Sequence, residues 1–150
     1  MTAPIELLPI GPEGQVDGLL QPLPAQVARV AEATAVLYGV EGFEPPWICY
    51  LARSGETIVG TSGFKGPPEA GRVELAYYTF ADHEGQGIAG AMAAELLALA
   101  KAHGAGIEVS AQTLPSRNAS HRVLEKLGFE HVETLEHPDD GLVWLWLQPT

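Results

Sequence analysis

The fold is decided by the stretch Gly85-Gln86-Gly87-Ile88-Ala89-Gly90, which lies between a predicted strand and a predicted long helix. The strand is predicted over Arg72–Phe80, where side chains alternate between two faces. The helix runs to about His103, and another strand follows at Ile107–Thr113. A strand, a helix and a second strand in this order favour a right-handed crossover between two parallel strands.

The rest of the chain adds elements on both sides of this unit. We predict helices at Ala25–Tyr38, which Gly39 and Gly42 end, and at Asn118–Leu127, and strands at Ile5–Leu8, Trp47–Ala52, Thr57–Phe64, Phe129–Leu135 and Leu142–Leu147. This order predicts a mixed α/β fold, with a partly antiparallel sheet flanked by helices in a single domain over residues 1–150. The last strand has little polar alternation, so we expect it to be buried on both faces or to pair with a second copy in a homodimer.

Composition excludes several classes of function. Eight Lys and Arg residues against nineteen Asp and Glu give a net charge of −11, which argues against binding to nucleic acid or to an anionic membrane surface. A lone cysteine, Cys49, and an N-terminal segment Met1–Ile10 without a basic region favour a cytoplasmic location. The five histidines show no metal-ligand spacing, so no metal is predicted, and we expect His83 and His121 to be solvent-exposed.

The glycine-rich stretch has a composition that suits phosphate binding. A helix N-terminus presents free N–H groups and partial positive charge, and glycines let a phosphate approach the backbone. The spacing also fits a dinucleotide-binding fingerprint, but Ala81–Glu84 separates the strand from the first glycine and the chain lacks a second mononucleotide half. A small dinucleotide-binding domain and a turn without any ligand remain alternatives at this point.

A second motif makes the pattern more specific. Asn118 and Ser120 precede the run Val123–Phe129, with the sequence Val-Leu-Glu-Lys-Leu-Gly-Phe. Together with Glu84–Ala89, which matches the loop pattern (Gln/Arg)-x-x-Gly-x-(Gly/Ala), this resembles the GNAT superfamily of acetyl-CoA-dependent N-acetyltransferases. Within that superfamily the sequence is most similar to the ribosomal-protein-acetylase-like branch, over about residues 45–148.

The resemblance implies an acetyl-CoA site along the central strand and the glycine-rich loop. In this family the loop amides bind the pyrophosphate, and the strand before the loop splays from its neighbour and pairs with the pantetheine amides. An Asn bonds the pantetheine arm, and a Ser lies near the thioester sulfur. The cofactor-binding residues implied here are Tyr77, Tyr78, Thr79, Gly85, Gln86, Gly87, Ile88, Ala89, Gly90, Asn118 and Ser120.

The implied reaction is direct attack of an amine on the thioester carbonyl in a ternary complex. Glu74 is the predicted general base, because it lies on the strand that leads to the cofactor-binding edge; a solvent-facing Glu74 is the alternative. Glu108 is the second choice. Backbone N–H groups around Tyr78–Thr79 are expected to polarise the carbonyl, and Ser120 to protonate the leaving thiolate.

Three positions depart from the family pattern. Glu84 stands where Gln or Arg is usual, and we expect its carboxylate to turn away from the pyrophosphate. Leu124 occupies the position where many members have a tyrosine acid. Asn118 lies two residues before Ser120, where many relatives have three. These departures leave a second hypothesis, a non-catalytic CoA-binding module or sensor with the same fold.

The acceptor is expected to be a primary amine of a small molecule or of a protein N-terminus. In this fold the acceptor pocket is built from the first helix, the loop after it and the later strands. The aromatic residues predicted to bind the acceptor are Tyr38, Phe43, Trp47 and Tyr50, with His137–Gly141 and Trp144 beside them. Burial of the tryptophans in the core is the alternative. The acidic net charge favours a cationic acceptor.

Overall fold

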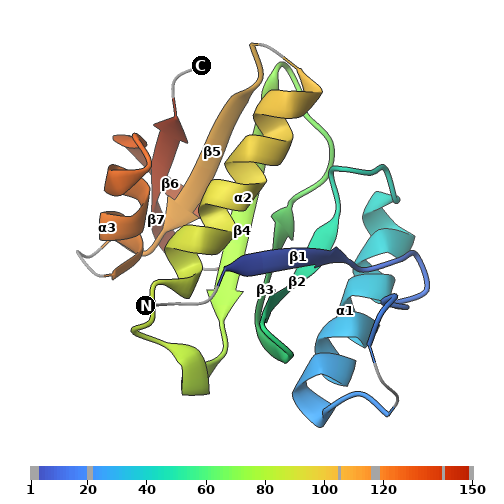
Figure 1. Cartoon of the computed structure of the whole chain (residues 1–150). Helices are drawn as coiled ribbons and strands as arrows, with labels where there is room; N and C mark the ends of the chain where they lie inside the picture. The colour runs from blue at the N-terminus through green and yellow to red at the C-terminus, as the bar shows by residue number, and fades with distance from the viewer. Residues whose placement is uncertain (1–3, 20–21, 105, 116–118, 140, 149–150) are drawn as a thin grey trace.

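The computed structural model of the chain has a single sheet with α1 on one face and α2 and α3 on the other (Figure 1). The structure describes residues 4–19, 22–104, 106–115, 119–139 and 141–148. The strands are β1 (Ile5–Pro9), β2 (Cys49–Ser54), β3 (Thr57–Phe64), β4 (Arg72–Thr79), β5 (Glu108–Thr113), β6 (Glu130–His137) and β7 (Gly141–Gln148). The helices are α1 (Ala25–Glu41), the short 3-10 helix η1 (Ala81–His83), α2 (Ile88–His103) and α3 (Ala119–Lys126).

The sheet has the strand order β1-β2-β3-β4-β5-β7-β6. Neighbouring strands are antiparallel except for β4 and β5, which are parallel and are joined by α2. The predicted crossover and the mixed α/β fold are therefore confirmed. Residues 72–113 form the centre of the sheet, and the antiparallel strands extend it on both sides.

The main core lies between the sheet and α2. Met92 and Leu96 of α2 are fully buried, and Leu96 packs in one cluster with Val73 and Leu75 of β4. Burying an aliphatic side chain of this size is worth about 1.5–3 kcal/mol. This packing fixes α2, and with it the glycine-rich turn, relative to β4.

The segment between α1 and β2 differs from the sequence prediction. The helix passes through Gly39 and ends at Glu41, with Gly42 at φ 93° donating its N–H to the carbonyl of Tyr38. Glycine inside a helix costs only about 1 kcal/mol, so burial of Tyr38 on the helix outweighs it. Trp47 was predicted in a strand but lies in a turn, because the proline pair before it bends the chain and β2 begins at Cys49.

The last strand is buried by its own chain. β7 lies between β5 and β6, and Val143, Leu145 and Trp146 are buried there. β6 is the edge strand, so pairing with a second copy is not needed to explain the apolar sequence of β7. The homodimer stays a prediction. No helix in the described part of the chain is long and apolar enough to cross a membrane.

Candidate active site

The sheet opens between β4 and β5. Their parallel pairing joins Arg72–Glu74 to Glu108–Ser110 and goes no further within the described residues. β5 continues to Thr113, but it pairs there with β7 on its other side. The two central strands therefore diverge just after Glu74, as the family resemblance implied.

The direction of the main-chain groups in β4 follows from its pairing with β3. The N–H of Lys65 donates to the carbonyl of Glu74 at 2.8 Å, and the N–H of Phe80 donates to the carbonyl of Val59 at 2.9 Å. The register between these two points is continuous, without a bulge. Even-numbered residues of β4 therefore direct their N–H and C=O groups toward β3, and odd-numbered residues direct theirs toward β5.

Two amides of β4 consequently face the opening. Tyr77 and Thr79 lie beyond the last position paired with β5, and both are odd-numbered. The amide of Tyr78 points toward β3 instead, and its side chain is 53% exposed on the α1 side of the sheet. An extended ligand that carries amide groups can add to β4 here in the manner of a further strand.

The glycine-rich turn lies where β4 and η1 lead into α2. Gly85 and Gly87 have φ values of 77° and 78°, and Gly87 is the left-handed N-cap of the helix. The first intrahelical N–H to find a partner is that of Ala91, which donates to the carbonyl of Gly87 at 3.2 Å. The amides of the first turn of α2 are therefore directed outward with the positive end of the helix dipole, an arrangement that suits an anionic group. Glu84 is exposed.

A hydrogen bond crosses the open side of the sheet from β4 to α3. The phenol of Tyr77 is bonded to the side chain of Ser120, in the first turn of α3, and burial raises the pKa of Tyr77 above its usual value. The phenol is therefore neutral at neutral pH, and its hydroxyl can donate to the serine oxygen or accept from the serine hydroxyl. Leu124, one turn further along α3, is fully buried. Asn118 lies outside the described residues.

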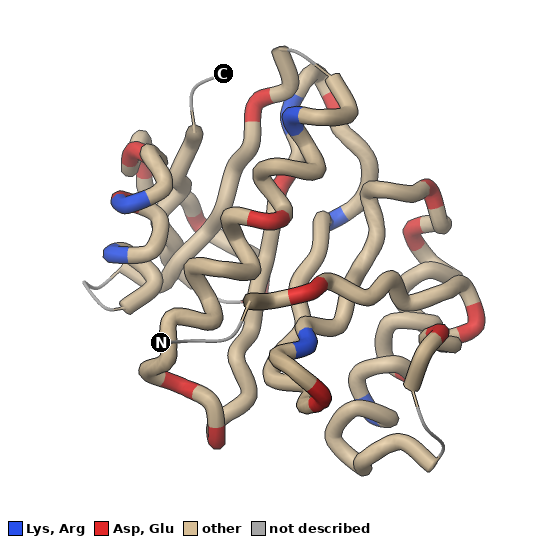
Figure 2. The backbone as a smooth tube through the Cα atoms, viewed as in Figure 1, with Lys and Arg blue, Asp and Glu red and all other residues tan. Residues whose placement is uncertain are grey.

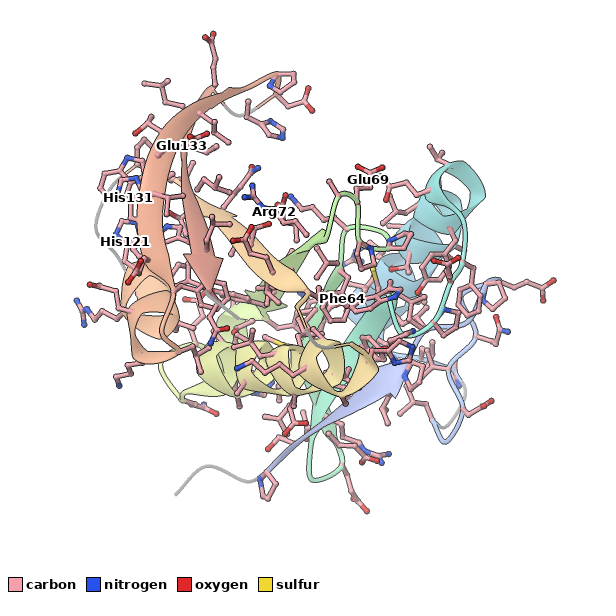
Figure 3. All side chains as sticks on the ribbon, turned by 90° about the horizontal axis from the view of Figure 1, so that it is seen from above. Phe64, Glu69, Arg72, His121, His131 and Glu133 are labelled. Atoms are coloured by element: carbon pink, nitrogen blue, oxygen red, sulfur yellow. The ribbon has the colours of Figure 1, made fainter. Side chains whose placement is uncertain are left out.

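Glu74 lies on the opposite face of β4 from Tyr77. Its carboxylate forms an ion pair with the ammonium of Lys65, with an N–O distance of 2.8 Å, and the amide of Gln112 approaches it at 3.5 Å. The side chain of Glu74 is 22% exposed. The second candidate base, Glu108, pairs with Arg72 at 2.7 Å, at the closed end of the β4–β5 pairing. Figure 3 shows this Arg72 between the β3–β4 connection and the β6–β7 hairpin.

A groove of about 380 Å³ lies between α1 and the face of the sheet that carries the side chain of Glu74. Its side walls are apolar residues of α1, and its floor is the paired residues of β3 and β4. The lining residues are Val30, Ala33, Thr34, Leu37, Cys49, Thr61, Ser62, Gly63, Phe64, Lys65, Ala76, Tyr77 and Tyr78. Gly63 allows β2 to approach this floor, because a Cβ there would come within 2.7 Å of the Cα of Cys49. Since Lys65 lines the groove and pairs with Glu74, the predicted base lies at one end of it.

The aromatic residues predicted to bind the acceptor do not line this groove. The Tyr38 hydroxyl donates to the carbonyl of Ile10 at 2.8 Å, that of Tyr50 donates to the carbonyl of Pro46 at 2.7 Å, and burial raises the pKa of each phenol to about 12. Trp47 is buried against Phe64 and His103. Phe43 packs on Tyr38 with its ring edge-on. These four side chains are therefore engaged in packing or hydrogen bonding within the protein and do not line the groove.

The two histidines predicted at the surface lie outside the groove, whereas Cys49 lines it. His121 was expected at the surface, but it is fully buried and stacks on Trp144 with 4.9 Å between ring centroids. Trp144 and Trp146 of β7 cover it, and the sequence of α3 alone does not reveal this contact. Burial also raises the pKa of Cys49, so this thiol is neutral and unreactive at neutral pH. His83 lines a separate cavity of about 700 Å³ beside the β2–β3 hairpin.

Sequence reasoning missed the groove-lining side chains of α1. Val30, Ala33 and Leu37 follow helical spacing, which is the signal for a packed helix face and does not distinguish the wall of a groove from the core. In the described part of the chain, the Lys and Arg positions are spread over several elements (Figure 2).

Comparisons with known proteins agree with this geometry. The family model described as acetyltransferase (GNAT) domain matches residues 21–130. No curated protein matches the chain. A GnaT-family acetyltransferase from Bordetella pertussis is similar in structure, with a TM-score of 0.66 and 21% identity over 99% of this chain and 97% of that one.

Two other solved structures are also similar to this chain. A ribosomal-protein-alanine N-acetyltransferase from Brucella melitensis has a TM-score of 0.64 and 19% identity, and covers 82% of this chain and 78% of its own. The acetyltransferase yncA from Salmonella typhimurium, solved with its cofactor acetyl-CoA, has a TM-score of 0.59 and 17% identity, with coverage of 83% and 72%. The family match spans most of this chain, and the divergence of β4 from β5 is the arrangement that the resemblance implied. The chain therefore belongs to the GNAT family of acetyltransferases.

Proposed function

We propose that this protein is an N-acetyltransferase that transfers an acetyl group from acetyl-CoA to a primary amine by direct attack in a ternary complex. The observation that carries the proposal is the divergence of β4 from β5 immediately after Glu74. Within the described residues, it leaves the amides of Tyr77 and Thr79 without a strand partner on the side of β5, between the carboxylate of Glu74 and the glycine-rich turn along the chain.

The residues present fit acetyl-CoA at two points. The outward amides in the first turn of α2 suit its pyrophosphate, and the amides of Tyr77 and Thr79 suit the two amides of its pantetheine arm. Exposed glycines at positive φ let the phosphates come close to the main chain. Acetyl-CoA supplies an activated acyl group and a thiolate leaving group. The protein itself must remove the amine proton, stabilise the charge on the thioester oxygen and provide a donor to the leaving thiolate.

Glu74 is the proposed general base. A free amine is mostly protonated at neutral pH, so a base must remove a proton before or during attack. The nitrogen then bonds to the thioester carbon, the carbon–sulfur bond breaks, and the amine proton passes to Glu74 directly or through a water. An N–H of β4 that faces the opening can donate a hydrogen bond to the thioester oxygen, which stabilises the negative charge that develops there.

Ser120 is the proposed donor to the leaving thiolate. It lies in the first turn of α3, across the opening from β4, and its side chain is held by Tyr77. Each hydroxyl can donate or accept, so a Tyr77 hydroxyl that donates to the Ser120 oxygen lets the serine hydrogen point to the sulfur. The buried Leu124 offers no donor in its place.

Replacement of Glu74 by Gln tests the role of this base. We expect kcat to fall by about 10²–10⁴, because that is the usual contribution of a general base, with little change in acetyl-CoA affinity. The measurement is release of free CoA thiol with a panel of primary amines. Glu108→Gln is the matched control, since it removes the same charge from the neighbouring ion pair at the closed end of the strands. Loss of activity in Glu108→Gln with an active Glu74→Gln would assign the base to Glu108.

The second candidate function is a CoA-binding module without catalysis, which the buried Leu124 favours. Thermal-shift measurements separate the candidates. Stabilisation by acetyl-CoA and not by NAD supports both forms of the CoA hypothesis and contradicts a dinucleotide-binding domain. Stabilisation by acetyl-CoA without turnover of any amine would contradict the enzyme and support the module.

A further inference from the structure

The groove between α1 and β4 is apolar along its length and charged at one end. Leu37 and Val30 of α1 face Ala76 and Tyr78 of β4 across it. Among the described residues that line it, the one charged side chain is Lys65, which is paired with Glu74. At about 380 Å³, the groove lies within the range of about 300–1,000 Å³ that small-molecule sites occupy.

Most polar groups in the lining are already engaged within the protein; one exception is the buried hydroxyl of Ser62, which has no hydrogen-bond partner among the described residues. The hydroxyl of Thr34 donates to the carbonyl of Val30 at 2.8 Å, and that of Thr61 donates to the carbonyl of Tyr50 at 3.0 Å. The main-chain groups of α1 bond within the helix, and those of Thr61 and Ala76 belong to the β3–β4 pairing. The groove therefore offers no row of main-chain donors and acceptors to an extended peptide.

The charges of Lys65 and Glu74 cancel, so the end of the groove where they lie has no net charge. The ammonium of Lys65 balances the carboxylate of Glu74 at 2.8 Å. Such a pair gives little attraction to a permanently charged ligand, and it tolerates the neutral amine, which is the form that attacks a thioester. The proton acceptor and the apolar surface lie next to each other on one face of β4.

We propose that the acceptor is a small primary amine with an apolar body, such as an alkyl or aryl amine, and not the N-terminus of a protein. The inference rests on the proposed function and narrows its acceptor. The amine nitrogen lies toward Glu74 and the opening of β4. The apolar body lies along Ala76 and Tyr78 and is covered by Leu37 of α1.

Competing acceptors test the inference. We would measure kcat/KM at saturating acetyl-CoA for 2-phenylethylamine, for ethanolamine and for the peptide Ser-Ala-Gly with a free N-terminus. The expected order has phenylethylamine at least tenfold above each of the others. An equal or higher value for ethanolamine or for the peptide overturns the inference but leaves the acetyltransferase standing. If no amine is acetylated, the proposed function fails and the inference fails with it.

Two substitutions on one helix locate the site. Leu37 and Val40 are both exposed residues of α1, at 39% and 82%, but only Leu37 lines the groove. Leu37→Asp should lower kcat/KM for phenylethylamine at least tenfold and leave the KM for acetyl-CoA unchanged. Val40→Asp introduces the same charge on the outward side and should behave as the unmodified protein. Equal effects of the two substitutions would overturn the placement.

A volume change gives an independent measurement in case Leu37→Asp fails to fold. Ala33 lines the groove, and Ala33→Leu narrows it while keeping the helix apolar. This variant should lower kcat/KM for phenylethylamine more than for methylamine, by at least fivefold. An equal loss for both amines would place the apolar body elsewhere.

Discussion

The two faces of β4 differ in what they offer a ligand. On the α2 face, Tyr77 bonds to Ser120 of α3, and the strand leads to the glycine-rich turn. On the α1 face, the Glu74–Lys65 pair lies at the end of an apolar groove, and Tyr78 lines its side. One face thus presents hydroxyls and outward amides, and the other presents a carboxylate and hydrocarbon.

The alternation of a single strand produces this difference. Adjacent residues in a strand point to opposite faces, so Tyr77 and Tyr78 serve different surfaces although they are neighbours in the sequence. The opening beside β5 lets a thioester lie at the level of the strand, between the two faces. An amine can then approach from one side while the leaving sulfur meets its donor on the other.

Gly87→Glu should break the cofactor side and have the largest effect. A non-glycine residue at φ 78° is strained by about 1–2 kcal/mol, and a carboxylate there opposes the pyrophosphate and the positive helix end. We expect the affinity for acetyl-CoA, measured by calorimetry, to fall at least about 100-fold. The structure of the groove on the α1 face should not change.

Gly55→Glu is the matched control for that substitution. Gly55 also has a positive φ, of 63°, and lies in the exposed β2–β3 turn with open space around it. It therefore carries similar strain and the same added charge away from the turn. If both variants lose acetyl-CoA to the same extent, the pyrophosphate site has been misplaced.

The elements that form the proposed cofactor side were predictable from the sequence because their determinants are local. The glycine pattern at Gly85–Gly90 follows a strand and opens a helix, and each of these features depends on residues close together in the chain. The same holds for the β3–β4 hairpin and for Thr57–Phe64, whose predicted bounds match β3. Periodicity predicts such elements well, because it reports which side of a strand or helix is buried.

The acceptor side was not predictable, because it depends on the distance of α1 from the sheet. Val27 and Val30 belong to one apolar stripe, but Val27 is buried in the core while Val30 also lines the groove. The bond between Tyr77 and Ser120 joins residues that are far apart in the sequence. No local pattern reports such a contact. The same limit explains why His121 was expected at the surface.

Tyr77→Phe and Tyr78→Phe sharpen the comparison, because the same oxygen is removed from each face. Loss of the Tyr77 hydroxyl frees Ser120 from its partner, and we expect kcat to fall about tenfold with the KM for acetyl-CoA unchanged. Tyr78→Phe should leave kcat within about twofold and act only on the KM of the amine. The measurement is steady-state release of CoA thiol by both variants at several amine concentrations.

The leaving group distinguishes a positioning role of Tyr77 from a general loss of packing. A selenoester analogue of acetyl-CoA releases a selenolate, which needs little protonation to leave. With the selenoester as acyl donor, Tyr77→Phe should react at nearly the same rate as the unmodified protein. A defect of the same size with both donors would assign Tyr77 a structural role only.

Tyr38→Phe should have the smallest effect on activity and tests how firmly the groove wall is attached. The hydroxyl of Tyr38 ties α1 to the rest of the protein, since it donates to the carbonyl of Ile10 and accepts from the N–H of Cys49 at 3.0 Å. Its loss should lower the free energy of unfolding by about 1 kcal/mol at neutral pH and change kcat by less than about twofold.

The same hydroxyl gives a pH dependence with a definite sign. An unfolded chain releases the proton of a tyrosine near pH 10, whereas the folded protein retains that of Tyr38 until about pH 12, because burial disfavours the phenolate. The unfolded state therefore binds fewer protons between these values, and the free energy of unfolding should fall as pH rises through this window. Urea unfolding of Tyr38→Phe should show a shallower fall, with the remainder due to Tyr50, whose pKa is also raised to about 12. Identical slopes for the variant and the unmodified protein would show that Tyr38 is open to solvent and that α1 is held to the sheet by other contacts.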